Sequence, residues 1–207
     1  MIITPSEHDP GDVYKLLIGS IVPRPIAFVS SVSADGIPNL APFSFFTAVC
    51  ANPPVICFCP MVRGSTASKK DTLQNIEATK QFVVNIVSED FAAQMNIASA
   101  EFPPGADEFR ESGLTPIPSD LVTPARVEES RISMECRLLQ VVEVSSRPRG
   151  GSIVIGEVLR FHVDDELFNN YRIDPDKLRP IGRMGGPTYT RTTDRFEMPR
   201  PDSPGTK

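Results

Sequence analysis

The sequence predicts a mainly β protein, built as an antiparallel barrel with a few short helices around it. Short runs rich in β-branched and aromatic residues recur along the 207-residue chain, and Pro, Gly or Asp-Gly marks the turns between them. Helical spacing of apolar residues is confined to short segments, and the regular strand-helix alternation of parallel α/β sheets is absent. An antiparallel barrel therefore fits better than a parallel sheet.

The first strands come from the N-terminal third of the chain. PIAFVSSVS (25–33) mixes β-branched and aromatic residues, and Asp35-Gly36 after it favours a tight hairpin turn and a returning strand. PVICFCPMV (54–62) is a short apolar run bounded by prolines and Gly64, which indicates a buried strand.

A short helix is predicted over residues 69–81. Leu73 and Ile76 have helical spacing, and the candidate N-caps are Ser68, Asp71 and Thr72. The chain then returns as a strand over 82–88 and continues as a second helix over 89–102.

The C-terminal half supplies the longest strands. Residues 103–124, rich in Pro, Gly, Asp and Ser, are predicted to form a surface excursion. Two β segments, 131–145 and 152–165, are joined by an RPRGG turn and predict a hairpin of the main sheet. Residues 165–178 are compatible with a short helix or a loop, and the glycine-rich 181–193 segment is predicted to be irregular.

The domain boundary follows from the composition of the C-terminus. Residues 197–207, EMPRPDSPGTK, are too polar and proline-rich to pack, so we expect a disordered tail. The rest, residues 1–196, is expected to form a single domain.

Composition and charge exclude several classes of partner. The net charge of −5 and pI near 5.1 give no basic surface for nucleic acid or an anionic membrane. No window approaches the roughly 20 apolar residues of a membrane span. The N-terminal segment carries Glu7, Asp9 and Asp12 where a signal peptide needs basic residues, so we expect a cytoplasmic protein.

The cysteines do not predict a metal centre. Cys50, Cys57, Cys59 and Cys136 lack paired CxxC spacing, and the chain has only two histidines. We therefore expect no metal and interpret the cysteines as buried free thiols, with Cys57 and Cys59 pointing the same way into a core.

No motif for nucleophilic, metal or nucleotide-loop catalysis is present. The sequence has no GxGxxG after a strand, and it lacks GxxxxGK[ST], GxSxG and HExxH. No residue is therefore assigned a catalytic role, and the remaining signals indicate binding.

One such signal is STASKKDT, residues 65–72. Hydroxyls and two lysines stand at a predicted helix start, where free backbone N–H groups and the helix dipole favour a phosphate. Ordinary helix capping with solvated lysines is the alternative.

A second signal is NLAPFSFF, residues 39–46. Pro42 removes a backbone donor, so we expect ladder pairing to stop there and leave neighbouring backbone groups free. Asn39 and Ser44 then have the chemistry to bond the polar rim of a flat ligand, while Ala41 keeps the wall low. An edge strand with a proline gatekeeper is the alternative.

Four further residues are weaker candidates. Arg24, held between prolines, suits a positioned cation, and Arg183 with Tyr189 suits a lid over a ring or a clamp on a phosphate. His162 has the chemistry to touch a ligand. Ordinary surface or packing roles are the alternatives.

Taken together, PRPIAFVS, the Asp-Gly turn, NLAPFSFF, KKDTLQNI, FVVNIVS and IGEVLRFHVDD resemble the flavin reductase-like family of FMN-binding split-barrel proteins. This family includes flavoredoxin and the reductase components of two-component monooxygenases. The resemblance covers residues 12–190 in the family's order. It implies a six-stranded antiparallel Greek-key split barrel, a homodimer, and FMN near the subunit interface.

The resemblance also implies roles for individual residues. The residues lining the isoalloxazine and ribityl chain would be Asn39, Ala41, Pro42, Phe43 and Ser44, and those holding the phosphate would be Ser68, Lys70, Asp71 and Thr72. Arg183 and Tyr189 resemble the C-terminal part of the site, and His162 matches a position near the flavin in some members.

The implied activity is that of an FMN-dependent NAD(P)H:flavin oxidoreductase. NADH or NADPH would be a transient hydride donor, and a monooxygenase or another electron-acceptor protein a partner. Two alternatives stay open: a flavoredoxin-like electron carrier that does not oxidise NAD(P)H itself, and a split barrel that binds haem or a deazaflavin.

Overall fold

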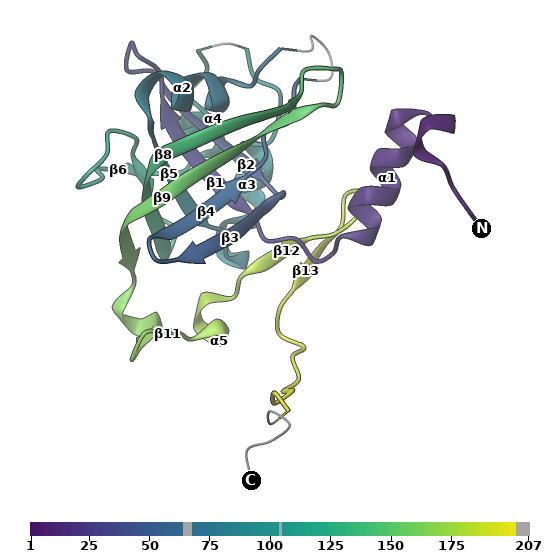
Figure 1. Cartoon of the computed structure of the whole chain (residues 1–207). Coiled ribbons are helices and arrows are strands. Elements are labelled where there is room, and N and C mark those ends of the chain that lie inside the picture. Colours follow the sequence, from purple (N-terminus) through teal and green to yellow (C-terminus); the bar gives the residue numbers. More distant parts are fainter. Residues whose placement is uncertain (64–67, 104, 202–207) are drawn as a thin grey trace.

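The computed structural model describes residues 1–63, 68–103 and 105–201 and is mainly β (Figure 1). Its centre is a seven-stranded sheet in the order β2-β1-β5-β8-β9-β4-β3, in which every neighbouring pair is antiparallel. The strands are β1 (Ala27–Val32), β2 (Pro38–Phe43), β3 (Phe46–Ala51), β4 (Pro54–Phe58), β5 (Gln81–Ile86), β8 (Ile132–Ser145) and β9 (Gly151–Val163). The predicted antiparallel architecture is confirmed.

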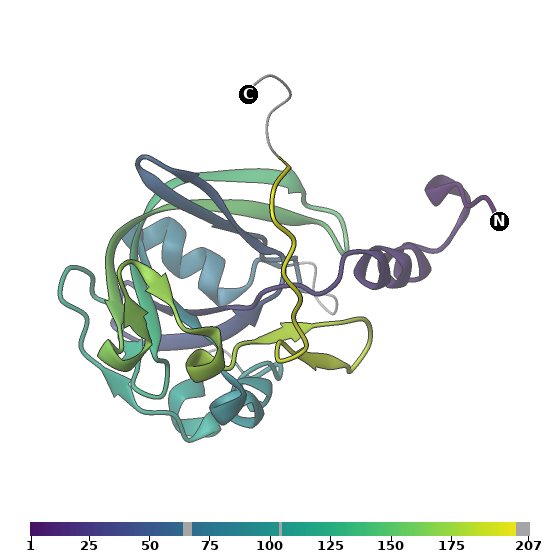
Figure 2. The same cartoon turned by 90° about the horizontal axis from the view of Figure 1, so that it is seen from below.

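The sheet has seven strands rather than the expected six. Its two edge strands, β2 and β3, follow each other in the chain and are separated only by Ser44 and Phe45. The segment that returns from the Asp-Gly turn pairs with β1 as far as Phe43, and from Phe46 onward it pairs with β4. Pairing with β1 thus continues through Pro42, and the expectation that it stops there is wrong. One predicted returning strand therefore becomes two, at opposite edges of a curled sheet (Figure 2).

Two strand pairings predicted from turn chemistry are confirmed. β1 and β2 form a hairpin around Gly36, whose φ of 84° is a left-handed conformation that glycine adopts without strain. β8 and β9 form the long hairpin predicted on either side of the RPRGG turn.

The hydrophobic core lies on both faces of β1 and β2. On one face, Phe43, Phe58 and Phe82 pack with ring centroids 5.0 and 5.6 Å apart, beneath helix α2 (Asp71–Thr79). On the other face, Phe28 and Leu40 pack under a short 3₁₀ turn (Glu89–Phe91) and helices α3 (Ala92–Ile97) and α4 (Glu108–Ser112). β2 is thereby held between α2 and the α3–α4 layer.

Three segments differ from the sequence prediction. The 103–124 excursion is not only surface, because it contains α4, and Phe109, Leu114 and Val122 are buried. It also contains β6 (Pro116–Ile117), which pairs with β7 (Arg126–Val127). The 181–193 segment is a hairpin of β12 (Ile181–Arg183) and β13 (Tyr189–Arg191) rather than irregular. Residues 165–178 form a 3₁₀ turn (Asp165–Leu167), β10 (Phe168–Asn169), β11 (Arg172–Ile173) and α5 (Pro175–Leu178).

The prediction that all four cysteines are buried is wrong for three of them. Cys136 is buried, Cys57 and Cys59 are partly exposed, and Cys50 is exposed. On β4 it is Ile56 and Phe58 that join the core, which leaves Cys57 on the opposite face.

Helix α1 (Pro10–Ser20), preceded by a 3₁₀ turn (Pro5–Glu7), projects from the barrel as an arm (Figures 1 and 2). It has no buried residue, and the apolar side chains of Leu16, Leu17 and Ile21 are 48, 46 and 53% exposed. Residues 197–201, the described part of the predicted tail, are exposed and have no regular structure.

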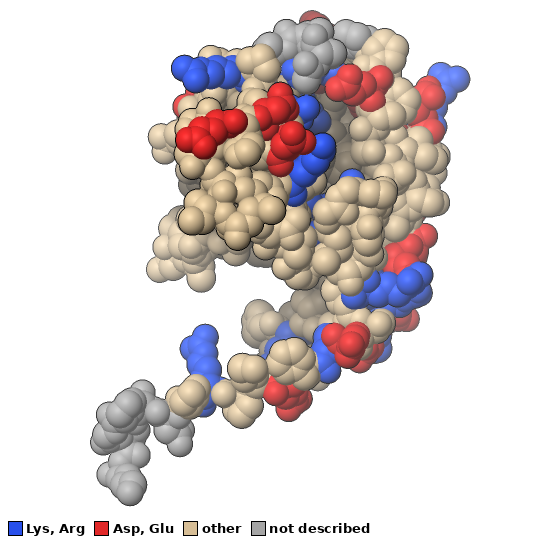
Figure 3. Space-filling model, turned by 90° about the vertical axis from the view of Figure 1, so that its right-hand side faces the viewer, with Lys and Arg blue, Asp and Glu red and all other residues tan. Residues whose placement is uncertain are grey.

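Two surface properties concern possible partners. On the face with α1 in front, acidic and basic side chains are interspersed (Figure 3). In the described residues, no helix has the length and apolar character needed to cross a membrane.

Candidate functional site

Most of the residues singled out in the sequence line two neighbouring pockets along β2. The first, of about 60 Å³, is lined by the predicted residues Asn39, Ala41, Pro42, Lys70, Asp71 and Thr72. The second, of about 200 Å³, is lined by Arg24, Pro42, Ser44, Arg183 and Tyr189. Pro42 and Ser99 border both, so segments far apart in the sequence form one divided cleft.

The floor of the first pocket ties β2 to the start of α2. The Asn39 amide donates to the Thr72 hydroxyl at 2.9 Å, and both side chains are buried. One of the two N–H groups of the Asn39 amide is thus used within the protein, and its role toward a ligand stays a prediction. Thr72 contributes to the pocket by fixing the first turn of α2 beside β2.

Lys70 gives this pocket an unneutralised positive charge. Its ammonium lies 5.4 Å from the centroid of the Phe43 ring, and it makes no hydrogen bond or ion pair with any residue in the described parts of the chain. Burial lowers the pKa of Lys70, and the nearby Arg63 guanidinium lowers it further, while Glu101 opposes both effects. A desolvated cation without a counter-ion is the feature that an anionic ligand would complete.

The neighbours of Lys70 make contacts that the sequence did not predict. The Asp71 carboxylate pairs with Arg63 at 2.6 Å, so it holds a second cation at the pocket. The N-cap of α2 is Lys70, which makes no side-chain capping bond, rather than one of the candidates Ser68, Asp71 and Thr72. Ser68 is exposed and lies outside the residues that line the pocket, although its carbonyl accepts from the Arg63 amide at 2.9 Å. Residues 65–67 of STASKKDT lie outside the described residues.

Glu108 is a pocket residue that sequence reasoning missed. It begins α4, is buried, and accepts a hydrogen bond from the Leu40 amide at 3.0 Å through Oε2. Burial raises the pKa of its carboxyl, although the Leu40 amide opposes this, and Asp71 and Asp107 raise it further. The other missed residues are Arg63, Ala98, Ser99, Ala100, Glu101 and Phe102. They sit in loops or at helix ends, and no local pattern marked them.

Arg24 braces the second pocket instead of offering a free cation. Its guanidinium donates to the carbonyls of Ile18 at 2.6 Å and Ile21 at 2.7 Å, at the end of α1, and to the Met184 carbonyl at 3.0 Å. It also contacts the Ser44 hydroxyl at 3.3 Å. Only 4% of Arg24 is exposed, and burial lowers its pKa.

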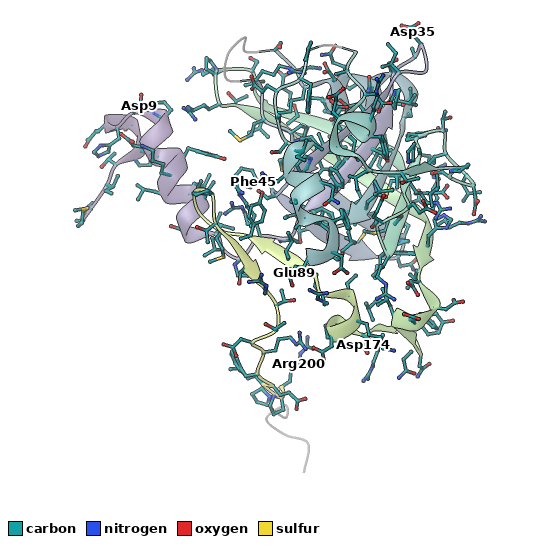
Figure 4. All side chains as sticks on the ribbon, turned by 180° about the vertical axis from the view of Figure 1, so that it is seen from behind. Asp9, Asp35, Phe45, Glu89, Asp174 and Arg200 are labelled. Atoms are coloured by element: carbon teal, nitrogen blue, oxygen red, sulfur yellow. The ribbon has the colours of Figure 1, made fainter. Side chains whose placement is uncertain are left out.

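Arg183 and Tyr189 form the predicted pair on the β12–β13 hairpin. The guanidinium of Arg183 stacks 4.4 Å from the Tyr189 ring centroid and donates to the Gly186 carbonyl. The Tyr189 hydroxyl donates to Asn96 on α3 at 3.3 Å. Glu89 secures the base of this hairpin through Arg179 and Arg191 (Figure 4).

Two predicted residues are not brought into the cleft. The Phe43 side chain belongs to the core against Phe58, and it reaches the site only as the surface beneath Lys70. His162 lines neither pocket, and its Nε2 lies 2.5 Å from Oε1 of the buried Glu135.

The carboxylate beside His162 serves the fold. Glu135 accepts from three consecutive backbone amides, those of Asp120, Leu121 and Val122. Although Asp120, Glu135 and His162 come within 4.8 Å of one another, hydrogen bonds to this loop account for the arrangement.

Comparison with known proteins identifies the family to which this chain belongs. Residues 18–181 match the family model described as "Flavin reductase like domain". The chain belongs to the flavin reductase-like family. Members of this family are oxidoreductases, which agrees with a cleft that lacks a nucleophile or metal motif.

The structure of nitrilotriacetate monooxygenase component B from Bacillus cereus is 38% identical, with a TM-score of 0.91 over 96% of this chain and 98% of that one. That of the 2-nitrobenzoate 2-nitroreductase of Pseudomonas fluorescens is 33% identical, with a TM-score of 0.87 over 99% and 100%. An uncharacterized protein of Aquifex aeolicus is 42% identical over 89% of this chain and 92% of its own.

The family suggests a flavin cofactor, and the residues present fit one. The orphaned cation of Lys70 and the Arg63–Asp71 pair suit a phosphate at the first pocket. The second pocket, bordered by Pro42, Ser44 and the Arg183–Tyr189 stack, offers planar surfaces to a ring system.

Proposed function

We propose that this flavin reductase-like protein is an FMN-dependent oxidoreductase that takes a hydride from NADH or NADPH and delivers the electrons to an acceptor. The observation that carries the proposal is Lys70, a half-buried ammonium with no counter-ion in the described residues, at the pocket that the family pattern assigns to the phosphate. A neutral cofactor would leave its desolvation uncompensated.

Bound FMN would supply a ring able to accept a hydride and release electrons. The residues of the chain bind FMN and orient its ring. Lys70 and Arg63 hold the phosphate, Pro42 and Ser44 border the ring, and the Arg183–Tyr189 stack limits the access of water from the β12–β13 side. A protein acid or base is not required, which fits the absence of a catalytic motif in the sequence.

The proposal includes a homodimer that covers the cleft. The two pockets measure about 60 and 200 Å³, below the roughly 300–1,000 Å³ of typical cofactor sites. Between α1, Phe45 and the β8–β9 turn runs a larger apolar groove of about 620 Å³ (Figure 4). A second copy packed on this groove and on the unburied face of α1 would close the site from outside.

Two kinds of final electron acceptor fit the proposal, a partner protein and a small molecule. One solved relative is named as a monooxygenase component and another as a 2-nitrobenzoate 2-nitroreductase, so the names of the relatives do not select one kind of acceptor for this chain. A flavoredoxin-like carrier, reduced by a partner protein and not by NAD(P)H, remains the alternative.

The first test is an absorption spectrum of the purified protein with FMN, before and after anaerobic NADH and then NADPH. We expect the oxidised-flavin band to bleach with at least one nucleotide, because the proposed reaction is hydride transfer from nicotinamide to the bound flavin. A bound flavin that stays oxidised with both would favour the electron carrier. Failure to bind FMN would refute the cofactor assignment.

A further inference from the structure

The C-terminal segment, residues 195–201, carries two large apolar side chains that no element of the chain covers. Phe196 is 83% exposed and Met198 is 79% exposed. Pro199 favours an extended backbone at the residue before it, and in an extended backbone alternate side chains lie on the same side. The segment therefore presents an apolar pair on one side and Glu197 on the other. Neighbouring exposed apolar groups of this size are typical of a surface that binds a partner.

The segment leaves the barrel from an anchored position. The Thr192 hydroxyl donates to the Pro180 carbonyl at 2.9 Å, and the Arg195 guanidinium pairs with Asp176 on α5. Beyond Arg195 no hydrogen bond or ion pair joins the segment, as far as the structure describes it, to the rest of the chain. It runs away from the barrel (Figures 1 and 4). Its apolar side chains are thus directed at no surface of their own chain.

An apolar groove of matching character lies at the other end of the molecule. The groove of about 620 Å³ between α1, Phe45 and the β8–β9 turn has walls formed by Val13, Leu17, Phe45, Met61, Val144 and Ile153. In Figure 1 the β8–β9 turn lies at the upper end of the barrel, whereas α5, which anchors the segment, lies at the lower end. The segment points away from the groove of its own chain, so that groove is open to a second copy.

Charges on the segment complement charges at the groove. Arg147 and Arg149 lie in the β8–β9 turn and line the groove, and neither forms an ion pair with a residue in the described ranges. On either side of Phe196 stand Asp194 and Glu197, which also lack a cationic partner among the described residues. An acidic, apolar segment therefore matches a groove that combines apolar walls with two unpaired guanidinium groups.

We propose that the C-terminal segment of a second copy fills this groove, with Phe196 and Met198 against the apolar walls and Glu197 beside the two arginines of the turn. The inference rests on the proposed homodimer, and it names the segment of the second copy that makes the contact. In a twofold-symmetric dimer the exchange is reciprocal, so each copy gives one segment and receives one. Tyr14 lines both the groove and the second pocket. The exchanged segment would thus support one wall of the proposed ring site.

Sedimentation at several concentrations tests the contribution of Phe196. In the full-length chain, Phe196→Ser should raise the dissociation constant of the dimer about tenfold or more, as for loss of a buried aromatic anchor from an interface. Phe168→Ser is the control, because Phe168 is also exposed, at 47%, but packs edge-on against Tyr171 between β10 and β11. The control should leave the dissociation constant unchanged.

The possible outcomes separate the inference from the proposals on which it rests. An unchanged dissociation constant for Phe196→Ser would overturn the exchange while leaving the homodimer intact. An unchanged protein that stays monomeric at every concentration would overturn both. Neither readout depends on hydride transfer, so the assignment of FMN and NAD(P)H is tested separately by the absorption spectrum.

A photocrosslink identifies the surface that the segment contacts. Benzoylphenylalanine replaces Phe196 in a mixture of light and heavy-isotope chains, and mass spectrometry identifies the joined peptides after irradiation. We expect crosslinks between a light and a heavy chain that end at Met61 or in the β8–β9 turn. Crosslinks within one chain or to another surface would overturn the inference. The absence of any crosslink in a sample that sediments as a dimer would also overturn it.

Discussion

At the residue scale, the cleft holds a lysine whose burial destabilises the folded protein when no ligand is bound. Lys70 lacks a counter-ion in the described residues, and burial lowers its pKa from the usual value for lysine. A lysine whose pKa is lower in the folded state binds fewer protons there than in the unfolded chain. Burial of the charged Lys70 therefore lowers the free energy of unfolding by its full amount at any pH below the pKa that Lys70 has in the folded protein. The loss of stability fades as pH rises from that pKa toward about 10.5, the usual pKa of lysine.

This sign gives a prediction for Lys70→Met. At neutral pH the ligand-free variant should melt higher than the unchanged protein, by about 2 to 4 °C for each kcal/mol of desolvation cost removed. Its affinity for FMN should fall by about tenfold or more, because a charge-assisted contact is lost, whereas that for riboflavin should hold. Thermal melts and flavin-fluorescence titrations measure the two effects.

Lys69 provides the matched control for that substitution. It is adjacent in sequence, but its ammonium is already paired with Glu77 at 2.7 Å. Lys69→Met should leave FMN affinity unchanged and should not raise the melting temperature. Equal losses of FMN affinity in both variants would contradict a specific phosphate contact at Lys70.

Sequence reasoning singled out residues that the structure gathers in one cleft, but it missed roles that depend on three-dimensional partners. Asn39, Ala41, Pro42 and Lys70 line the first pocket, and their binding of a cofactor stays a prediction. No local pattern revealed that the Arg24 guanidinium would bond the carbonyls of Ile18 and Ile21 at the end of α1. The position of these carbonyls depends on the direction in which α1 leaves the barrel. Glu108 was missed because its partner, Leu40, lies 68 positions away.

At the element scale, strands joined by short turns were predictable from the sequence. Elements held in place by residues far away in the sequence were not. The β8–β9 hairpin was predicted because alternation and turn residues are adjacent in sequence. The β12–β13 hairpin was not, because its short strands depend on bonds to Glu89 and Asn96. The segment after the Asp-Gly turn divides into β2 and β3 because β2 pairs with β1 and β3 pairs with β4. No local sequence pattern predicts this change of partner.

Arg24 links two of these elements, and Arg24→Lys tests that link. A lysine ammonium cannot reproduce the planar fork that bonds Ile18, Ile21 and Met184 together. We expect the α1 arm to open more often and trypsin to cleave at the exposed Lys15 about tenfold faster, which corresponds to about 1.4 kcal/mol of local opening. Mass spectrometry of timed digests gives the rate.

The control for this experiment is Arg137→Lys, which alters an exposed ion pair with Glu157 on the β8–β9 hairpin. That change should leave the cleavage rate at Lys15 as it is. If Arg24→Lys also leaves the rate unaltered, the arm is held by contacts other than the Arg24 fork.

At the scale of the whole molecule, the sequence identified the antiparallel barrel but not its unpartnered surfaces. The barrel class follows from strand content and turn spacing, which are properties of short segments. An amphipathic helix such as α1 has the same appearance in sequence whether it covers its own barrel or a second chain. In the structure, α1 buries no residue and borders the 620 Å³ groove next to Phe45.

The proposed homodimer therefore has a direct test in Leu17→Asp. Leu17 lines the groove and is 46% exposed, so a second copy would bury it and a charge there would have to be desolvated. Leu121 is the matched control, since it is 47% exposed but lies between β6 and β7, on the opposite side from α1 (Figure 1). Sedimentation at several concentrations should give a dimer for the unchanged protein and for Leu121→Asp, and a monomer for Leu17→Asp. The monomer should also bind FMN more weakly, because its cleft stays open to water. A folded Leu17→Asp protein that remains dimeric would show that the copies meet on another surface.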